Sequence, residues 1–182
     1  MLNYKDKLKQ FNSTDKYRKE LLFLTQLLDP KEDESIIDYG CGTGAAMDHI
    51  RSNYKSNVYG FDVTEDYYEG DKFFFRTEIF FKVQSIYFMH SFAHIDFPPL
   101  EKLKDDFLLP QGKVVIITPN IDWLNLQSKD NYKPDTTVAH HYSSSELETL
   151  FIENGYTIRF SGQFGEQINN VHERLFLVAE IN

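Results

Sequence analysis

The chain has 182 residues, the length of one ordinary domain, and we predict a single domain over residues 1–182. Its 19 basic and 28 acidic residues give a net charge of −9. Binding of a polyanion depends on a basic surface, so we do not expect nucleic acid as a partner. No apolar run approaches the roughly 18 residues of a membrane span, and the first residues lack the apolar core of a signal peptide. We therefore expect a cytoplasmic protein with no membrane association.

Helix and strand patterns alternate along the first half of the chain. Apolar residues recur at helical spacing from Tyr17 to Leu28, within an N-terminal helical segment at residues 1–30. In chain order, the patterns predict helices at 14–28 and 44–52, strands at 35–39, 57–63, 72–76 and 83–89, and a short helix or turn at 65–68. A strand, a helix and a strand within so short a span favour a parallel, right-handed unit.

The second half of the chain continues this alternation. Pro98-Pro99 predicts the start of a helix that Gln111-Gly112 ends, before an apolar strand. Residues 121–142 have no firm periodicity, which predicts a lid or substrate loop. A capping box at 143–146 opens a further helix. The patterns predict strands at 113–118, 156–160 and 174–180, the last two antiparallel because only a turn-rich segment separates them.

Three glycines after the first strand indicate a ligand site. Gly40, Gly42 and Gly44 permit a sharp turn from strand to helix and a close approach of a ligand to the backbone. Asp38 lies two residues before the first glycine, where its carboxylate can accept hydrogen bonds from a cationic amino group. Cys41, the single cysteine, occupies a position that needs a small residue, so we expect it to pack rather than to do redox chemistry.

Two classes of ligand fit this turn. Asp62 follows Gly42 by 20 residues, as an acidic residue that binds ribose hydroxyls does, so the ligand is expected to contain adenosine. The pattern G-x-G-x-x-A also fits a dinucleotide such as NAD. Asp38 would repel a pyrophosphate, Gly44 makes the pattern G-x-G-x-G, and the closing hairpin leaves no room for a second nucleotide-binding half.

Residues 38–44, Asp-Tyr-Gly-Cys-Gly-Thr-Gly, resemble motif I of the class I S-adenosylmethionine-dependent methyltransferases. Residues 60–63 resemble the acidic end of the second strand in that family, 83–95 its fourth strand, and 108–116 its junction with the fifth strand. The tail from residue 118 resembles the small-molecule branch that includes quinone-biosynthesis enzymes. The resemblance implies an α/β, Rossmann-like three-layer sandwich with a mostly parallel seven-stranded sheet and an antiparallel C-terminal strand.

The resemblance also implies the cofactor, S-adenosyl-L-methionine, and the residues that bind it. The glycine backbone would contact the methionine part, Asp38 its ammonium group and Asp62 the ribose. Glu78 would hold the adenine amino group, although the helix usually found after it is lost here or reduced to a turn, and the His90 backbone would lie under the ribose. The cofactor-binding residues implied are Asp38, Gly40, Cys41, Gly42, Gly44, Asp62, Val63, Glu78, Ile79 and His90.

The predicted activity is transfer of a methyl group to a small-molecule acceptor. Methyl transfer from a sulfonium needs alignment and exclusion of water, and an oxygen or nitrogen acceptor can also need a base. His94 is the candidate catalytic base, with His140 and His141 as further candidates. His90 and His94 lie four residues apart, but no second ligand cluster accompanies them, so we predict no metal site. Two alternatives remain: a non-catalytic S-adenosylmethionine-binding protein and an NAD(P)-dependent oxidoreductase.

Overall fold

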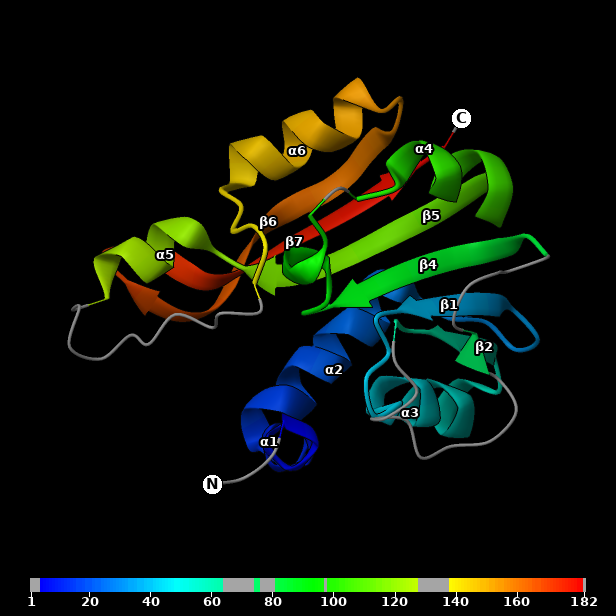
Figure 1. Ribbon diagram of the computed structural model, residues 1–182, viewed down its shortest axis with the longest axis horizontal. Coiled ribbons are helices and arrows are strands. Elements are labelled where there is room, and N and C mark those ends of the chain that lie inside the picture. Colours follow the sequence, from blue (N-terminus) through cyan, green and yellow to red (C-terminus); the bar gives the residue numbers. More distant parts are fainter. Residues whose placement is uncertain (1–3, 64–73, 76–80, 97, 128–137, 182) are drawn as a thin grey trace.

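The computed structural model describes residues 4–63, 74–75, 81–96, 98–127 and 138–181 (Figure 1). The helices are α1 (Tyr4–Asn12), α2 (Asp15–Leu28), α3 (Ala45–Tyr54), α4 (Leu100–Lys102), α5 (Ile121–Leu126) and α6 (Ser144–Glu153), with a 3₁₀ turn η1 (Phe92–His94) and a π-helical turn η2 (Leu103–Phe107). The strands are β1 (Ser35–Tyr39), β2 (Asn57–Phe61), β3 (Phe74–Phe75), β4 (Val83–Met89), β5 (Leu108–Pro119), β6 (Thr157–Ile168) and β7 (Val171–Glu180).

The strands form one mixed sheet in the order β3-β2-β1-β4-β5-β7-β6. Neighbours from β3 to β5 pair in parallel, and β7 is antiparallel to both β5 and β6. The predicted mostly parallel sheet with an antiparallel C-terminal strand is confirmed. β3 contributes two residues at the edge of the sheet. Because β1, β2, β4 and β5 run the same way, their carboxyl ends meet at one edge, where open α/β sheets bind their ligands.

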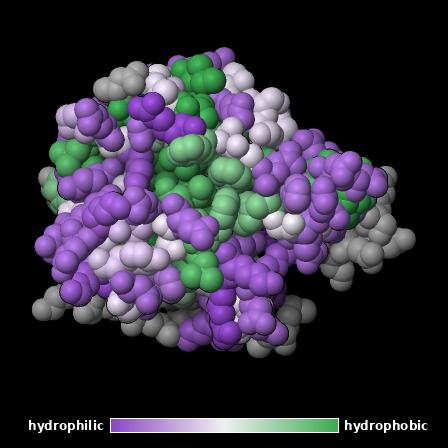
Figure 2. All heavy atoms as spheres, turned by 180° about the vertical axis from the view of Figure 1, so that it is seen from behind, coloured by the Kyte–Doolittle hydropathy of each residue, from purple (hydrophilic) through white to green (hydrophobic). Residues whose placement is uncertain are grey.

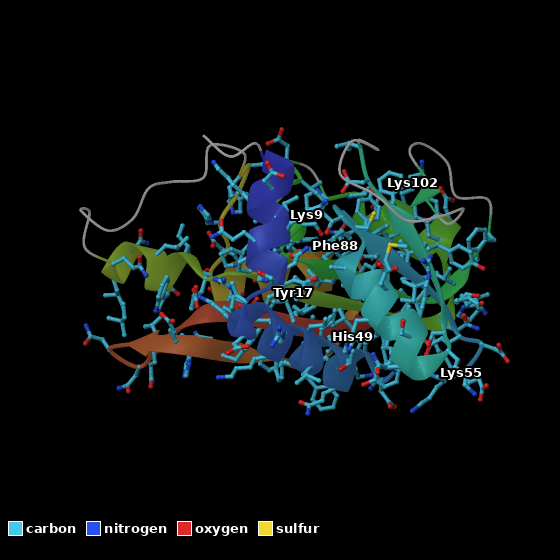
Figure 3. All side chains as sticks on the ribbon, turned by 90° about the horizontal axis from the view of Figure 1, so that it is seen from below. Lys9, Tyr17, His49, Lys55, Phe88 and Lys102 are labelled. Atoms are coloured by element: carbon cyan, nitrogen blue, oxygen red, sulfur yellow. The ribbon has the colours of Figure 1, made fainter. Side chains whose placement is uncertain are left out.

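Helices cover both faces of the sheet. Figure 1 shows α4 and α6 on one side and α2 and α3 on the other, and Figure 3, seen from below, shows α2 and α3 lying in front of the sheet. Each face has its own hydrophobic core. Side chains of η2 and α6 such as Leu103 and Phe151 pack on one face, and Leu24 of α2 and Met47 of α3 pack on the other. The central strands therefore have buried side chains on both faces, as expected for a parallel sheet.

Two helices form where the sequence predicts them. The side chain of Thr14 accepts a hydrogen bond from the backbone of Tyr17 at the start of α2, and Leu21, Leu24 and Leu28 then face the core. At the start of α6, Ser143 and Glu146 form both hydrogen bonds of the predicted capping box. In both cases the start signal and the apolar stripe agree, so local sequence is sufficient.

The helix predicted from Pro98 to Gln111-Gly112 is shorter than expected. The α-helical part covers three residues of α4, the π-helical turn η2 follows, and β5 already begins at Leu108. Leu108 is fully buried and pairs with Val83 of β4. Gln111, with a φ of 62°, and Gly112 lie within β5 at a register shift rather than at a helix end. Pairing with the sheet thus overrides the helical pattern in this segment.

Three further segments differ from the sequence prediction. Residues 121–126 of the predicted loop form α5, because the Asn120 side chain accepts a hydrogen bond from the backbone of Asp122 and caps the helix. β6 and β7 together form a hairpin much longer than the two predicted strands. The N-terminal segment contains α1 in addition to α2, a helix that the apolar pattern does not reveal.

The surface seen from behind in Figure 2 is largely hydrophilic, with hydrophobic residues gathered near its middle. Among the described residues, no helix has both the length and the apolar character needed to cross a bilayer.

Candidate functional site

The glycine turn connects β1 to α3 at the carboxyl edge of the sheet. Gly40, Gly42 and Gly44 have φ values of 83°, 52° and 80°, which side-chain-bearing residues rarely adopt. A Cβ atom on Gly40 would lie 2.3 Å from the Cβ of Ser91, so the turn and the segment after β4 are in direct contact. The backbone amides of Gly40 and Cys41 both donate to the carbonyl of Phe61, at 2.6 and 3.1 Å. These contacts fix the turn between the ends of β2 and β4.

Asp38 is a buried carboxyl group beneath this turn. It is 2 % exposed, and burial raises its pKa to about 7, with the nearby Asp62 adding to the rise. A buried carboxylate is costly unless a positive group compensates it. The position therefore fits a ligand with a cationic group better than one with a pyrophosphate.

Asp62 lies next to the glycine turn. It follows β2, and its Oδ2 accepts a hydrogen bond from the backbone amide of Gly42 at 2.9 Å. This hydrogen bond holds the carboxylate beside Gly42 of the turn. Val63, the next residue, is 83 % exposed. Glu78 and Ile79 lie outside the described residues, so their adenine role stays a prediction.

Cys41 packs inside the turn, as the sequence predicts. It is buried, and a Cβ atom on Gly60 would lie 2.8 Å from its Sγ atom, so the thiol fills space beside β2. Burial, with help from the charges of Asp38 and Asp62, raises the pKa of the thiol well above its ordinary value. The thiol is therefore protonated at neutral pH and poorly nucleophilic.

Helix α1 covers the glycine turn. The Asn12 side chain donates a hydrogen bond to the Thr43 hydroxyl at 2.8 Å, and the Leu8 side chain lies 3.8 Å from the position of a Cβ on Gly42. The Phe11 ring packs edge-on against the ring of His90, with centroids 5.7 Å apart. Consecutive residues of α1 thus reach the glycine turn and the end of β4 together.

His90 follows β4 in a left-handed backbone conformation, with a φ of 64°. Its backbone amide donates to the carbonyl of Ile117 at 2.8 Å, so the chain stays attached to β5 as it leaves the sheet. The Nε2 atom lies 2.7 Å from Oε2 of Glu20 on α2. Sequence reasoning assigned a role only to the backbone here, whereas the structure gives the side chain a buried acidic partner.

Glu20 belongs to a cluster of charged residues that the sequence analysis missed. Its Oε1 accepts from Nε of Arg174 at 3.0 Å, and Arg174 in turn contacts Glu173 at 2.9 Å. Lys16 donates to Glu173 at 2.5 Å. Glu20 is 4 % exposed, Glu173 5 % and Arg174 9 %. The sequence does contain an indication of this cluster. Glu20 lies three residues after Tyr17, on the apolar stripe of α2 that faces the core, and a carboxylate at such a position is expected to have a charged or hydrogen-bonding partner.

Burial and pairing act in opposite directions within this cluster. Burial raises the pKa of Glu20, but the hydrogen bond with His90 and the charges of His90, Arg174 and Lys16 bring it below its ordinary value. Burial lowers the pKa of His90, and Glu20 offsets only part of this effect. At neutral pH the arrangement is a carboxylate beside a neutral imidazole.

The other candidate histidines lie elsewhere. His94 is exposed in η1, four residues beyond His90. The backbone amide of His140 donates to the carbonyl of Ala93 at 3.0 Å, and its ring packs against Tyr142 with centroids 4.4 Å apart. Tyr142 is itself part of the core, beside Phe92. The roles of His94, His140 and His141 in catalysis stay predictions.

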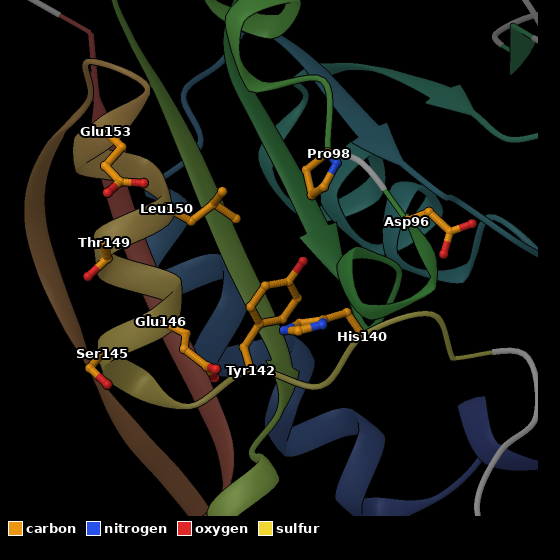
Figure 4. Close-up of a pocket in the computed structure, with 9 residues that line it drawn as sticks. All are labelled: Asp96, Pro98, His140, Tyr142, Ser145, Glu146, Thr149, Leu150 and Glu153. Carbon is orange, nitrogen blue, oxygen red and sulfur yellow. The ribbon is translucent and has the colours of Figure 1, made fainter.

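A pocket of about 510 Å³ lies between α6 and the segment that follows η1. Figure 4 shows the side chains that line it. It is lined by Asp96, Pro98, His140, Tyr142, Ser145, Glu146, Thr149, Leu150 and Glu153. None of the described cofactor-binding candidates lines it, so it is separate from the glycine turn. Within the described residues, no group of three or more His, Cys, Asp or Glu side chains is arranged to hold a metal ion.

Several solved structures share this fold. A methyltransferase from Aquifex aeolicus, described as SAM-dependent, has a TM-score of 0.69 and 21 % identity, covering all of both chains. An S-adenosylmethionine-dependent methyltransferase from Clostridium acetobutylicum has a TM-score of 0.69 and 10 % identity, covering 98 % of this chain and 99 % of its own. Magnesium protoporphyrin IX methyltransferase from Synechocystis, solved with bound SAH, has a TM-score of 0.66 and 14 % identity, covering 100 % of this chain and 89 % of its own.

The search of curated proteins finds no match. A family model described as a methyltransferase domain matches residues 10–159. The match includes the glycine turn, Asp62, the Glu20–His90 pair and most of the sheet. The chain belongs to this methyltransferase domain family.

Proposed function

We propose that the protein uses S-adenosyl-L-methionine to methylate a small-molecule acceptor. The observation that carries the proposal is the buried Asp38 beneath the glycine turn, together with Asp62 held 2.9 Å from the amide of Gly42. A zwitterionic nucleoside with an ammonium group and ribose hydroxyls matches these two carboxylates. Family membership supports the reaction class.

Each residue then has a specific task. Asp38 binds the ammonium group of the methionine part, whose positive charge compensates the buried carboxylate. The backbone at Gly40, Gly42 and Gly44 lies against the methionine part, and the buried Cys41 packs behind the turn. Bound S-adenosylmethionine supplies a methyl group on a positively charged sulfur, which is already activated for transfer.

The remaining contacts surround the nucleoside. Asp62 binds the ribose hydroxyls and Val63 lies alongside them, while Glu78 and Ile79 hold the adenine. The His90 backbone lies under the ribose. Helix α1 closes over the turn through Asn12 and excludes water, and we assign the segment 121–142, including α5, to acceptor binding.

A small-molecule acceptor is favoured by the acidic charge of the chain, since a nucleic acid would meet net repulsion. We place the protein in the small-molecule, quinone-biosynthesis-like branch of the family, on the resemblance of its C-terminal segments.

Calorimetry with S-adenosylmethionine, S-adenosylhomocysteine and NAD tests the cofactor. We expect both sulfur compounds to bind and NAD not to bind. Asp62→Asn keeps an oxygen for the Gly42 amide but loses the negative charge at the ribose, so we expect it to weaken the binding of S-adenosylhomocysteine at least about tenfold. Asp48→Asn, on the exposed face of α3, is the matched control and should leave binding unchanged. Binding of NAD alone would contradict the proposal.

Transfer of a tritium-labelled methyl group tests the acceptor. In three separate reactions, the protein and the labelled donor are incubated with a deproteinised metabolite extract, with purified RNA or with a protein fraction. We expect label in the metabolite fraction. Label confined to RNA or protein would refute a small-molecule acceptor, and donor binding with no transfer to any fraction would favour the non-catalytic alternative.

A further inference from the structure

The Glu20–His90 pair has the geometry of a carboxylate that orients an imidazole. Nε2 of His90 lies 2.7 Å from Glu20, and Arg174 holds the other oxygen of that carboxylate at 3.0 Å. An ionised carboxylate only accepts hydrogen bonds, so Nε2 carries the ring proton and Nδ1 keeps its lone pair. Within the described part of the chain, no hydrogen bond to Nδ1 is formed. The ring is therefore fixed in the tautomer whose basic nitrogen is Nδ1.

The pair lies beside the candidate methyl-donor site. Ser91, the residue after His90, is in direct contact with the glycine turn at Gly40. Phe11 of α1 packs on the His90 ring, and the adjacent Asn12 bonds to Thr43 of the turn. The His90 side chain keeps 21 % of its surface exposed and that of Glu20 only 5 %, so a small molecule reaches the imidazole more readily than the carboxylate.

We propose that His90 is the general base that deprotonates a hydroxyl acceptor and that Glu20 is its positioning residue, an inference that rests on the methyltransferase function proposed above. The acceptor oxygen attacks the methyl carbon, a carbon–oxygen bond forms, and the carbon–sulfur bond breaks with its electron pair going to sulfur. The hydroxyl proton passes to Nδ1 of His90. The resulting imidazolium is stabilised by Glu20 and then returns the proton to water.

The presence of a general base indicates which class of acceptor the protein methylates. A carboxylate acceptor is already ionised at neutral pH and needs no base, whereas a phenolic hydroxyl has a pKa of about 10 and gains from proton removal during attack. We therefore assign the acceptor to compounds with a phenolic or similar hydroxyl group.

The charges around His90 suit this role. Glu20 and Lys16 face the cluster from α2, and Glu173 and Arg174 face it from β7. From α1, Phe11 adds an uncharged ring. Burial keeps His90 neutral at physiological pH, and the paired carboxylate is ready to compensate the charge that appears on proton uptake. We assign the role to His90 rather than to the exposed His94 because Glu20, held by Arg174, fixes the orientation of the His90 ring.

Nuclear magnetic resonance of ¹⁵N-labelled histidine tests the tautomer without an acceptor. The His90 signal is assigned by its loss in His90→Gln, and the wild-type protein is titrated from pH 5 to 9 with S-adenosylhomocysteine bound. We expect a neutral ring at pH 7.5 with the proton on Nε2. A ring that stays protonated up to pH 8, or one with the proton on Nδ1, would overturn the proposal.

Methyl transfer to phenol and catechol, with benzoate as the carboxylate comparison, tests the chemistry. In His90→Gln the side-chain amide can still donate to Glu20 but cannot take up a proton. We expect its rate to fall by about 10²- to 10⁴-fold and the rising limb of the pH–rate profile to disappear. His49→Gln, at an exposed contact on α3, is the matched control and should keep the wild-type rate. A wild-type rate in His90→Gln, or methylation of benzoate alone, would refute the assignment.

Calorimetry with S-adenosylhomocysteine separates the two levels of proposal. We expect His90→Gln to bind it within about threefold of the wild type, because the variant keeps the backbone and the bond to Glu20. Absence of binding by the wild-type protein would refute the proposed function itself. Normal binding combined with an unchanged rate in His90→Gln would refute only the role of His90.

Discussion

The buried carboxyl group of Asp38 predicts that the ligand-free protein becomes less stable as the pH rises. Burial raises its pKa to about 7, whereas in the unfolded chain the pKa is about 3.9. Between these values the folded protein holds a proton that the unfolded chain has lost, so each increase in pH favours unfolding. The penalty is absent below the unfolded pKa, grows up to the folded pKa and is constant above it.

The size of the effect follows from the pKa difference. About three pKa units correspond to about 4 kcal/mol, at about 1.4 kcal/mol per unit. Asp38→Asn preserves the shape of the side chain and removes the charge. We expect this variant to exceed the wild type in free energy of unfolding by about 2–4 kcal/mol at pH 8, and to match it within about 1 kcal/mol at pH 4.5.

Urea denaturation followed by the fluorescence of Trp123, the single tryptophan, measures the difference. Asp48→Asn is the control, because the Asp48 side chain is 67 % exposed, and it should change stability by less than about 0.5 kcal/mol. If Asp38 also binds the ammonium group of the methyl donor, Asp38→Asn gains stability but loses donor affinity at least about tenfold. An Asp38→Asn variant less stable than the wild type at pH 8 would refute the reasoning.

Two further pairs of variants test the turn and the core. Gly40→Ala brings a Cβ atom to 2.3 Å from Ser91 at a φ of 83°, whereas in Gly42→Ala the nearest atom to the new Cβ lies at 3.8 Å. We expect Gly42→Ala to lower the free energy of unfolding by about 1–2 kcal/mol, and Gly40→Ala to lower it by at least about 2 kcal/mol more. Equal urea midpoints would show that the contact relaxes at little cost. Phe151→Ala empties a fully buried position in α6 and should cost about 3–5 kcal/mol, while Ile152→Ala, at a site 59 % exposed, should cost less than about 0.5 kcal/mol. Similar thermal shifts for these two variants would contradict the packing described for α6.

Local signals explain where sequence reasoning succeeded. The cap and apolar stripe of α2 and the capping box of α6 are short-range features that act in the same direction as the tertiary packing. The glycine turn is similar, because positive φ values at Gly40 and Gly44 leave little choice of residue. Where the local pattern competed with sheet pairing, as at Leu108, the prediction was wrong.

The candidate site combines both kinds of information. The order Asp38, glycines, Asp62 along the chain predicted a nucleoside site, and the structure brings Asp62 to the Gly42 amide. The side-chain role of His90 depends on Glu20, 70 positions earlier in the chain. No spacing rule links residues so far apart.

The sequence by itself determined the strand and helix pattern around the glycine turn, because backbone conformation and amphipathic periodicity are properties of neighbouring residues. Only the tertiary structure decided what surrounds that turn. Packing of α2 against the end of β4 brings Glu20 within hydrogen-bonding distance of His90, and β7 contributes Arg174 from near the other end of the chain. A buried charge is tolerated only where partners from other elements compensate it, so these partners become known only from the tertiary structure.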